Sequence, residues 1–379
     1  MLKNSKIFVA GHEGMVGSAI LANLQRKGYT NLLIRTRSEL DLADCTAVAA
    51  FFEKERPEYV FLAAAKVGGI VANNLYRADF LYQNLMIQTN VIHQSYIYKV
   101  KKLLFMGSTC IYPKNCSQPI KEEYLLTSEL EYTNEPYAIA KIAGMKMCES
   151  YNLQYGTNFI AVMPTNLYGP KDNFDLETSH VLPALVRKMF LGKALEENDW
   201  GSIANDLNKR PIRGIDGDNK SYEILEVLEK FGITSTPKQV TIEIWGSGSP
   251  LREFLWSEDM ADACRFLMEH IQFQDIVEWM LNPKDQVEVR NTHINIGSGK
   301  EISIKDLAIL VKEIIGFKGA LFFNTEKADG TLRKVTDISR LKNLGWSSTI
   351  DLREGIQRMY RELATVDDFF NGSKDTIPT

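Results

Sequence analysis

The stretch Ile-Phe-Val-Ala-Gly-His-Glu-Gly-Met-Val-Gly-Ser, residues 7–18, decides the fold of this 379-residue chain. Its first four residues are apolar and predict a short buried strand, and the run 18–27 predicts a helix. A strand, a glycine turn and a helix in this order are the context of a dinucleotide-binding fingerprint. An ordinary glycine-rich turn is the alternative. The glycines of the turn are spaced as Gly-x-x-Gly-x-x-Gly, at Gly11, Gly14 and Gly17.

Each glycine has a physical role in such a turn. Gly11 permits the tight turn, Gly14 lets a pyrophosphate approach the backbone, and Gly17 lets the helix pack on the strand. The amides at the start of the helix then face the phosphates. We therefore assign the whole turn to a dinucleotide: Gly11, His12, Glu13, Gly14, Met15, Val16 and Gly17.

The end of the next strand, predicted over 32–34, indicates which dinucleotide binds. An NAD site usually places an acidic residue here, whereas this chain has Arg35 and Arg37. Arginine suits a ribose 2′-phosphate, so the sequence predicts NADP(H), bound through Arg37 with help from Arg35. The alternative is that one or both arginines are merely solvated. Asp41 and Leu42 resemble a turn that contacts the adenine.

The rest of the chain alternates strands and helices. Strands are predicted over 59–63, 102–106 and 159–163, and helices over 80–98 and 137–155. This alternation predicts an α/β fold, a doubly wound parallel Rossmann sheet with a smaller C-terminal α/β substrate lobe.

The pattern loosens after residue 170. We expect a dinucleotide-binding domain over 1–170, joined by returning segments from the C-terminal half, a substrate lobe over 171–365 and a tail over 366–379. Within the lobe, residues 192–239 are polar and glycine-rich and predict an insertion with one helix over 222–230.

Composition excludes several classes of function. The net charge is −4, so no basic field favours nucleic acid or an anionic membrane. No apolar run is long enough to span a bilayer, and no residues have metal-ligand spacing. The cysteines are scattered without a Cys-x-x-Cys pair, which predicts reduced thiols in a cytoplasmic protein: Cys45, Cys110, Cys116, Cys148 and Cys264.

The pair Tyr137 and Lys141 lies at the start of the predicted helix 137–155. Residues four apart share one helix face, and an ammonium beside a phenol is expected to lower the pKa of the tyrosine. Such a phenol can exchange a proton near neutral pH. The pair alone is weak evidence for a catalytic site, since two residues at this spacing more often form a surface pair. Ser108, just after the strand 102–106, strengthens it.

Four longer motifs resemble the GDP-L-fucose synthases, a family within the extended short-chain dehydrogenase/reductase superfamily. They are Ala-Ala-Ala-Lys-Val-Gly-Gly-Ile-Val-Ala-Asn-Asn (63–74), Cys-Ile-Tyr-Pro-Lys (110–114), Asn-Glu-Pro-Tyr-Ala-Ile-Ala-Lys (134–141) and Met-Pro-Thr-Asn-Leu-Tyr-Gly-Pro (163–170). The resemblance covers nearly the whole chain, except about 192–239 and 279–291. It implies NADPH-dependent 3,5-epimerisation and 4-reduction of GDP-4-keto-6-deoxy-D-mannose.

The resemblance also implies roles for individual residues. Cys110 and His180 would exchange protons at C3 and C5, which the C4 ketone acidifies. Ser108 and Tyr137 would hydrogen-bond the C4 oxygen, and Lys141 would tune Tyr137 and hold the nicotinamide ribose. Further contacts to the cofactor would come from Ala63, Ala64, Ala65, Pro164, Thr165, Asn166, Leu167 and His180.

For the nucleotide half of the substrate, the family pattern falls on Lys188, Trp245, Arg252 and Asp329. The family more often has arginine at position 188, so either Arg187 or Lys188 could meet the phosphate. A related GDP-4-keto sugar, such as a GDP-heptose intermediate, is the alternative substrate. A non-catalytic nucleotide-sensing scaffold is the alternative from another class.

A homodimer is also expected. The helices 80–98 and 137–155 carry apolar residues on more than one face, among them Met145, Met147 and Tyr151. A helix that is apolar beyond one stripe needs a second partner for burial. The resemblance implies that these two helices pair between subunits.

Overall fold

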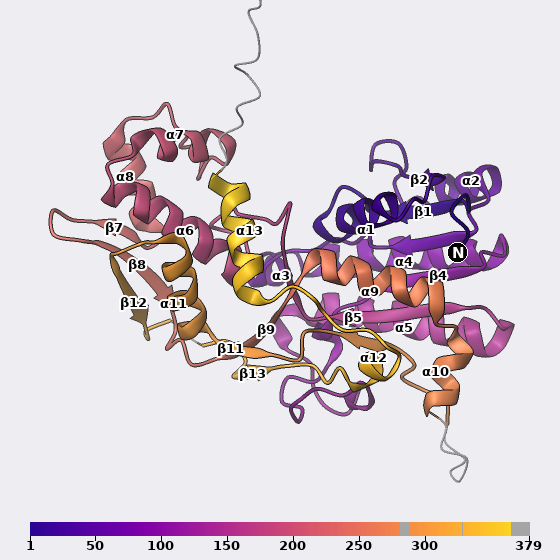
Figure 1. Ribbon diagram of the computed structural model, residues 1–379. Helices are drawn as coiled ribbons and strands as arrows, with labels where there is room; N and C mark the ends of the chain where they lie inside the picture. The colour runs from indigo at the N-terminus through magenta and orange to yellow at the C-terminus, as the bar shows by residue number, and fades with distance from the viewer. Residues whose placement is uncertain (281–287, 328, 365–379) are drawn as a thin grey trace, which may run out of the picture.

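The N-terminal elements assemble into a six-stranded sheet in which every neighbouring pair of strands is parallel (Figure 1). The computed structural model describes residues 1–280, 288–327 and 329–364. The order of strands is β10-β5-β4-β3-β1-β2. Chain order therefore reverses between β1 and β3, where doubly wound folds bind ligands. The strands are β1 (Ile7–Ala10), β2 (Leu32–Leu33), β3 (Tyr59–Leu62), β4 (Lys102–Met106), β5 (Phe159–Pro164) and β10 (Ile294–Ile296).

Helices cover both faces of this sheet, which explains why its central strands are buried and, apart from Lys102 of β4, apolar. One face packs against α2 (Cys45–Glu55), α4 (Arg77–Ile97) and α5 (Glu135–Tyr155). The other packs against α1 (Met15–Arg26), α9 (Ser257–His270), α10 (Phe273–Met280) and α12 (Ser339–Asn343). The predicted doubly wound α/β fold is confirmed.

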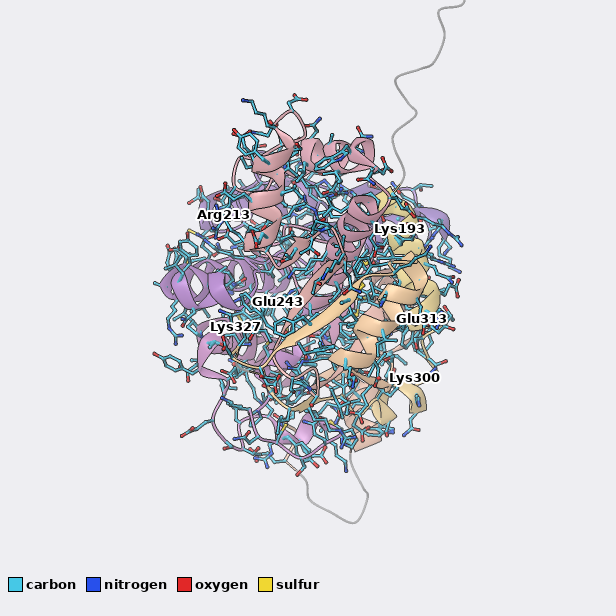
Figure 2. The ribbon with its side chains drawn as sticks, turned by 90° about the vertical axis from the view of Figure 1, so that its left-hand side faces the viewer. Lys193, Arg213, Glu243, Lys300, Glu313 and Lys327 are labelled. Carbon is cyan, nitrogen blue, oxygen red and sulfur yellow. The ribbon has the colours of Figure 1, made fainter. Side chains whose placement is uncertain are left out.

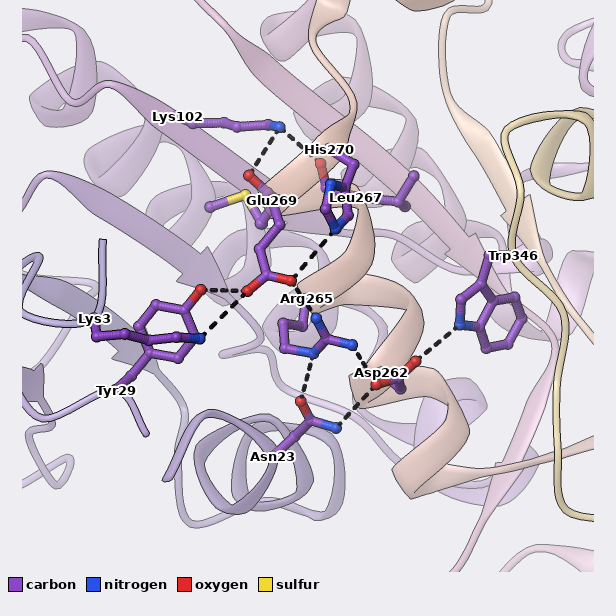
Figure 3. Close-up of polar contacts among 11 residues, drawn as sticks. Lys3, Asn23, Tyr29, Lys102, Asp262, Arg265, Leu267, Glu269, His270 and Trp346 are labelled. Atoms are coloured by element: carbon purple, nitrogen blue, oxygen red, sulfur yellow. Dashed lines mark hydrogen bonds and ion pairs between the residues drawn. The ribbon is translucent and has the colours of Figure 1, made fainter. Parts of the chain in front are cut away.

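A polar network joins α1 to α9, which comes from the C-terminal half of the chain (Figure 3). Arg265 of α9 donates from Nε to Asn23 Oδ1 of α1 at 3.1 Å and pairs with Asp262 at 2.7 Å. Lys102 of β4 donates to the carbonyl oxygens of Leu267 and Met268 at 2.7 and 3.1 Å. These contacts fasten the returning segment to the N-terminal sheet.

The second region contains two smaller sheets, on the left of Figure 1. In one, β8 (Val240–Trp245) lies between β7 (Ile233–Ser235) and β12 (Ala320–Asn324). In the other, β9 (Leu251–Trp256) lies between β11 (Glu301–Ser303) and β13 (Arg333–Lys334), and β6 (Asn166–Tyr168) also pairs with β9. Because β6 follows β5 directly and pairs with residues 254–256, the end of β9 lies beside the carboxyl edge of the large sheet.

Five helices pack on these sheets around one apolar cluster. They are α6 (Val181–Glu196), α7 (Trp200–Lys209), α8 (Ser221–Lys230), α11 (Ile304–Ile315) and α13 (Leu352–Ala364). Charged side chains such as Arg213 and Glu313 cover the outside of this region (Figure 2). The remaining short helices are α3 (Ile70–Leu75), η1 (Thr109–Ile111), η2 (Glu122–Tyr124) and η3 (Tyr132–Asn134).

The insertion is more ordered than the sequence predicts. The expected helix over 222–230 is α8, but α7 precedes it and was not predicted. Ile203 and Leu207 of α7 are fully buried, since they lie four residues apart and face the same cluster as α8. The expected tail over 366–379 lies outside the described residues, as does most of the stretch 279–291. The division of the chain near residue 170 stays a prediction.

Candidate active site

The glycine turn between β1 and α1 is closely packed at two of its three glycines. Gly11 has a φ of +84°, and a Cβ there would lie 2.7 Å from the backbone of Ala64. A Cβ at Gly17 would overlap the carbonyl oxygen of Gly11. A Cβ at Gly14 would meet only ordinary contact, 3.7 Å from that oxygen. The protein itself therefore needs glycine at positions 11 and 17, and position 14 leaves room for a ligand.

Polar groups at this turn are available to an anion. The helix α1 starts after Gly14 without a side-chain cap, so its first amides keep their donor capacity. His12 Nδ1 is buried without a protein partner, and Glu13 is exposed. Met15 and Val16 are half-buried at the start of the helix. The turn thus fits the pyrophosphate of a dinucleotide.

The two arginines after β2 differ in their surroundings. Arg35 donates from Nη2 to Glu55 Oε1 at 3.0 Å and lies 5.5 Å from the ring centroid of Phe51, so α2 holds it. The side chain of Arg37 is 75% exposed, and its nearest carboxylate, Asp41, lies 3.9 Å away. Of the two, Arg37 is therefore the arginine with the exposed guanidinium, and its contact with a 2′-phosphate stays a prediction.

One loop at the carboxyl edge of the sheet adjoins the glycine turn, since a Cβ at Gly11 would lie 2.7 Å from the backbone of Ala64. After β3, the half-buried run Ala63, Ala64 and Ala65 leads to Lys66, whose backbone N–H and C=O bond to Asn84 at 2.9 and 3.0 Å. This clamp fixes the loop over α4.

After β5, Pro164 is the last residue of the strand and the next three residues cross to the second region. Thr165 N–H donates to the carbonyl of Ile296 at 2.9 Å, and Asn166 Nδ2 donates to that of Glu253 at 2.8 Å. Leu167 is half-buried between them and the core. Leu42, which follows β2 at the other end of the sheet, is buried, with Asn90 of α4 bonded to its carbonyl oxygen at 2.9 Å.

The carboxyl end of β4 and the start of α5 bring Ser108, Cys110 and Tyr137 together. The Ser108 hydroxyl caps η1 by accepting from the Cys110 N–H at 3.2 Å. The Tyr137 phenol lies close enough to both residues that Cys110 raises its pKa and Ser108 lowers it. The ring of Phe80 packs edge-on against Tyr137 at 6.5 Å. A thiol, a hydroxyl and a phenol therefore meet at one point, on elements predicted from the sequence.

The expected tuning of Tyr137 by Lys141 is not found. Burial raises the pKa of Tyr137, with a smaller opposing effect from the Ser108 hydrogen bond. Burial lowers the pKa of Lys141 to about 7, and its ammonium donates to the Met106 carbonyl at 2.8 Å. Lys141 lies 5.7 Å from the Tyr137 ring centroid. Desolvation of both groups outweighs their mutual attraction, which a spacing of four residues cannot reveal.

His180 is the residue that immediately precedes α6. Its side chain keeps exposed surface, yet enough protein surrounds the ring that desolvation lowers its pKa. The segment before it approaches the loop after β3, since a Cβ at Gly69 would lie 3.0 Å from the Thr178 carbonyl oxygen. The imidazole is therefore largely neutral near pH 7.

Arg187 is engaged in buried contacts within the protein, which favours Lys188 in the choice left open between the two. The Arg187 guanidinium is fully buried: Nε donates to Asp206 at 2.8 Å and Nη1 to the Phe174 carbonyl at 3.1 Å. It joins α6 to α7. Lys188 points instead to β8, where it donates to the Glu243 carbonyl at 3.2 Å, and burial lowers its pKa to about 8.

Trp245, Arg252 and Asp329 gather where β8 ends and β9 begins. Trp245 is 67% exposed, with Lys327 5.5 Å from its ring centroid. Arg252 donates to the Thr331 carbonyl at 2.6 Å, and burial lowers its pKa. Asp329 accepts from the Ser247 N–H and hydroxyl at 2.9 and 2.7 Å, so it shapes the turn beside them.

Lys334 of β13 was not predicted from the sequence. Its ammonium lies 3.9 Å from Cys110 Sγ, a contact between residues 224 positions apart. No local motif connects the two residues, because the pairing of β13 with β9 brings them together.

The fold and this set of side chains at the carboxyl edge are those of an extended short-chain dehydrogenase/reductase. The sequence model of the NAD dependent epimerase/dehydratase family matches residues 7–212 and 224–297, and the chain belongs to this family. None of the described helices is both long and apolar enough to cross a membrane.

Individual relatives are similar over almost their whole length. GDP-L-fucose synthase 1 of Arabidopsis thaliana is 48% identical over 358 residues, which cover 94% of this chain and 93% of that protein. GDP-L-fucose synthase of Escherichia coli strain K12 is 44% identical over 371 residues, covering 98% and 100%. The resemblance drawn from the four motifs is thus confirmed.

A solved structure is also similar. The GDP-D-glycero-L-gluco-heptose synthase of Campylobacter jejuni, crystallised in the presence of NADPH, is 48% identical with a TM-score of 0.87. The match covers 96% of this chain and 100% of that one.

Proposed function

We propose that this enzyme converts GDP-4-keto-6-deoxy-D-mannose to GDP-L-fucose by epimerisation at C3 and C5 and reduction at C4. The observation that carries the proposal is the meeting of Ser108, Cys110 and Tyr137 at the carboxyl end of β4. Identity of 44–48% to two GDP-L-fucose synthases over nearly the whole chain supports it.

The cofactor that fits is NADP(H). The glycine turn and the uncapped start of α1 would hold its pyrophosphate, and Arg37 its 2′-phosphate. The loop 63–65 and Lys141 border the same edge. When bound, the reduced nicotinamide supplies a hydride for C4.

The side chains divide the proton chemistry. The C4 ketone acidifies the protons on C3 and C5, and Cys110 and His180 remove and return them on opposite faces of the ring. As negative charge develops on the C4 oxygen, the Ser108 and Tyr137 hydroxyls donate hydrogen bonds to it. Tyr137, protonated at neutral pH because burial raises its pKa, gives its proton to that oxygen on reduction.

The nucleotide half of the substrate meets the second region. Arg252 presents a guanidinium suited to a diphosphate oxygen, and the exposed ring of Trp245 offers a face for stacking. Lys188, at the β8 side, adds a cation near neutral pH. Asp329 shapes the turn that joins β8 to β9.

The Cys110→Ser variant tests the function. Loss of a positioned base costs typically about 10²–10⁴-fold in rate, so deuterium uptake from heavy water should fall by that factor. NADPH should still be consumed slowly, giving a GDP-sugar that is not epimerised. Cys116→Ser, six residues along the same segment, is the matched control and should keep the wild-type rate. GDP-L-fucose formation at the wild-type rate by Cys110→Ser would contradict the proposal.

A related GDP-4-keto heptose is the second candidate substrate, because the similar solved structure is named for a GDP-heptose product. NADPH oxidation measured with both keto sugars decides between them. If only the heptose is turned over, the GDP-4-keto heptose is the substrate of this enzyme. Oxidation with neither would favour a non-catalytic scaffold.

We also propose a homodimer in the cytoplasm. Several large apolar side chains on α4 and α5 remain exposed, among them Tyr82 at 64% and Leu153 at 54%. The five cysteines are free thiols, which suits a reducing compartment.

A further inference from the structure

The segment that carries Lys334 is fixed against the loop that follows Cys110. Val335 N–H donates to Gln118 Oε1 at 3.0 Å, and Ile120 N–H donates to the Val335 carbonyl at 2.8 Å. The next residue, Thr336, donates its N–H and hydroxyl to the buried Glu253 at 2.9 and 2.7 Å. The backbone of Lys334 is therefore held in place by neighbours on both sides.

Lys334 and Cys110 both line a cavity of about 60 Å³. The other charged groups that line it have partners: Lys114 pairs with Glu131 at 3.0 Å. Arg333 pairs with Glu301 at 2.8 Å, outside the cavity. Among the described residues, the polar contact recorded for the Lys334 ammonium is the one to sulfur, at 3.9 Å.

The charge of Lys334 acts on the nearby thiol of Cys116. Burial raises the pKa of Cys116, and Lys334 opposes this rise. From the α5 side, the group that faces Cys110 is the Tyr137 phenol, which is neutral at pH 7. The backbone N–H of Cys110 donates to the Ser108 hydroxyl. Lys334 is thus the cation placed to act on the Cys110 sulfur.

We propose that Lys334 is a positioning residue that stabilises Cys110 as a thiolate, the form able to take a proton from the sugar. The inference deepens the proposed function, since it rests on Cys110 as an epimerisation base. The thiolate takes the proton from carbon and becomes a thiol, and the electrons of the C–H bond pass to the enolate. Lys334 neither gains nor loses a proton in this step, so the step needs no further reactant.

Alkylation of the free enzyme tests this without substrate. Native protein is treated with iodoacetamide across a pH series, quenched and digested with trypsin. The cysteines then fall on separate peptides: 103–114 with Cys110, 115–121 with Cys116 and 38–54 with the exposed Cys45. Removing a cation about 4 Å from a partly exposed thiol raises the alkylation midpoint of Lys334→Met by about one pH unit.

The expected pattern has three parts. In Lys334→Met, Cys110 alkylation at pH 7 falls about tenfold, Cys116 slows less, and Cys45 is unchanged. Lys334→Arg restores the midpoint because it keeps the charge. Arg333→Met, which removes one charge from the same strand, leaves Cys110 unchanged.

Equal Cys110 midpoints in wild type and Lys334→Met would overturn the inference. If Lys334→Met fails to fold by circular dichroism, Lys334→Gln takes its place in the same series. Deuterium uptake at pH 7 should fall about tenfold in Lys334→Met and recover at higher pH. If Cys110→Ser keeps full epimerisation while Cys110 alkylation in the wild-type background still depends on Lys334, the role of Cys110 as a base is wrong. The effect of Lys334 on the Cys110 thiol would still be supported.

Discussion

At the scale of single residues, Arg37 decides the choice of cofactor. Its guanidinium is exposed and 3.9 Å from Asp41, so it can turn to a phosphate without losing a buried partner. A charge-assisted hydrogen bond contributes about 1.5–3 kcal/mol, so Arg37→Ala should raise the Michaelis constant for NADPH roughly 10- to 100-fold. The constant for NADH, which has no 2′-phosphate, should change little.

Arg35→Ala is the matched comparison. Arg35 is bonded to Glu55 of α2, so its loss should lower the melting temperature and affect both cofactors alike. If Arg37→Ala weakens NADPH and NADH equally, the guanidinium does not meet the 2′-phosphate.

At the scale of elements, the β1–α1 turn separates glycines needed for folding from one needed for binding. In Gly17→Ala the new Cβ overlaps the Gly11 carbonyl, and the backbone must move, so the melting temperature should fall by several degrees or the protein should not fold. Gly14→Ala meets only a 3.7 Å contact and should fold normally, yet bind NADPH more weakly because the methyl group occupies the ligand's place.

Thermal unfolding and fluorescence titration with NADPH measure the two effects separately. Gly28→Ala cannot serve as the control for Gly14→Ala. Gly28 has a φ of +80°, so alanine would strain the backbone there. A stable Gly17→Ala protein, or Gly14→Ala with wild-type affinity, would contradict this division.

Sequence predicts the elements of the large sheet because each carries its own local signals. The strand over 102–106 carries the apolar run 103–106, and the helix α11 is capped by the Ser303 hydroxyl and ended by Gly316. The helix α7 was missed because Gly201 and its asparagines weaken its helical propensity. Its signal was the cap Asp199, whose carboxylate accepts from Ser202 N–H at 3.0 Å.

The site residues that belong to a sequence motif could be predicted. The properties that depend on tertiary packing could not. Ser108, Cys110 and Tyr137 lie together because strand ends and helix starts share one edge. Which of Arg187 and Lys188 faces the core depends on the rotation of α6, which only α7 and β8 define. The Lys141 pKa depends on burial, which sequence does not measure.

At the scale of the whole molecule, the exposed apolar side chains of α4 and α5 predict a dimer. Ile139, Leu153 and Tyr155 of α5 are between 44% and 54% exposed, although α5 is a long helix whose other side is core. Leu153→Glu should place a charge in the interface and give the monomer mass in light-scattering chromatography.

Phe322→Glu is the matched control, since Phe322 is 53% exposed on β12 in the other region and should leave the mass unchanged. A monomeric wild-type protein at micromolar concentration would refute the dimer.

The strand β10 has a consequence for how the protein is made. It pairs with β5, but Ile294 lies 130 positions after Pro164 in the chain. A ribosome adding about 5–20 residues per second needs roughly 6–26 s to synthesise that stretch. Throughout this interval the nascent chain presents β5 as an open edge, a surface to which chaperones or another unfinished copy can bind. The nucleotide-binding half of the enzyme is thus completed only late in translation.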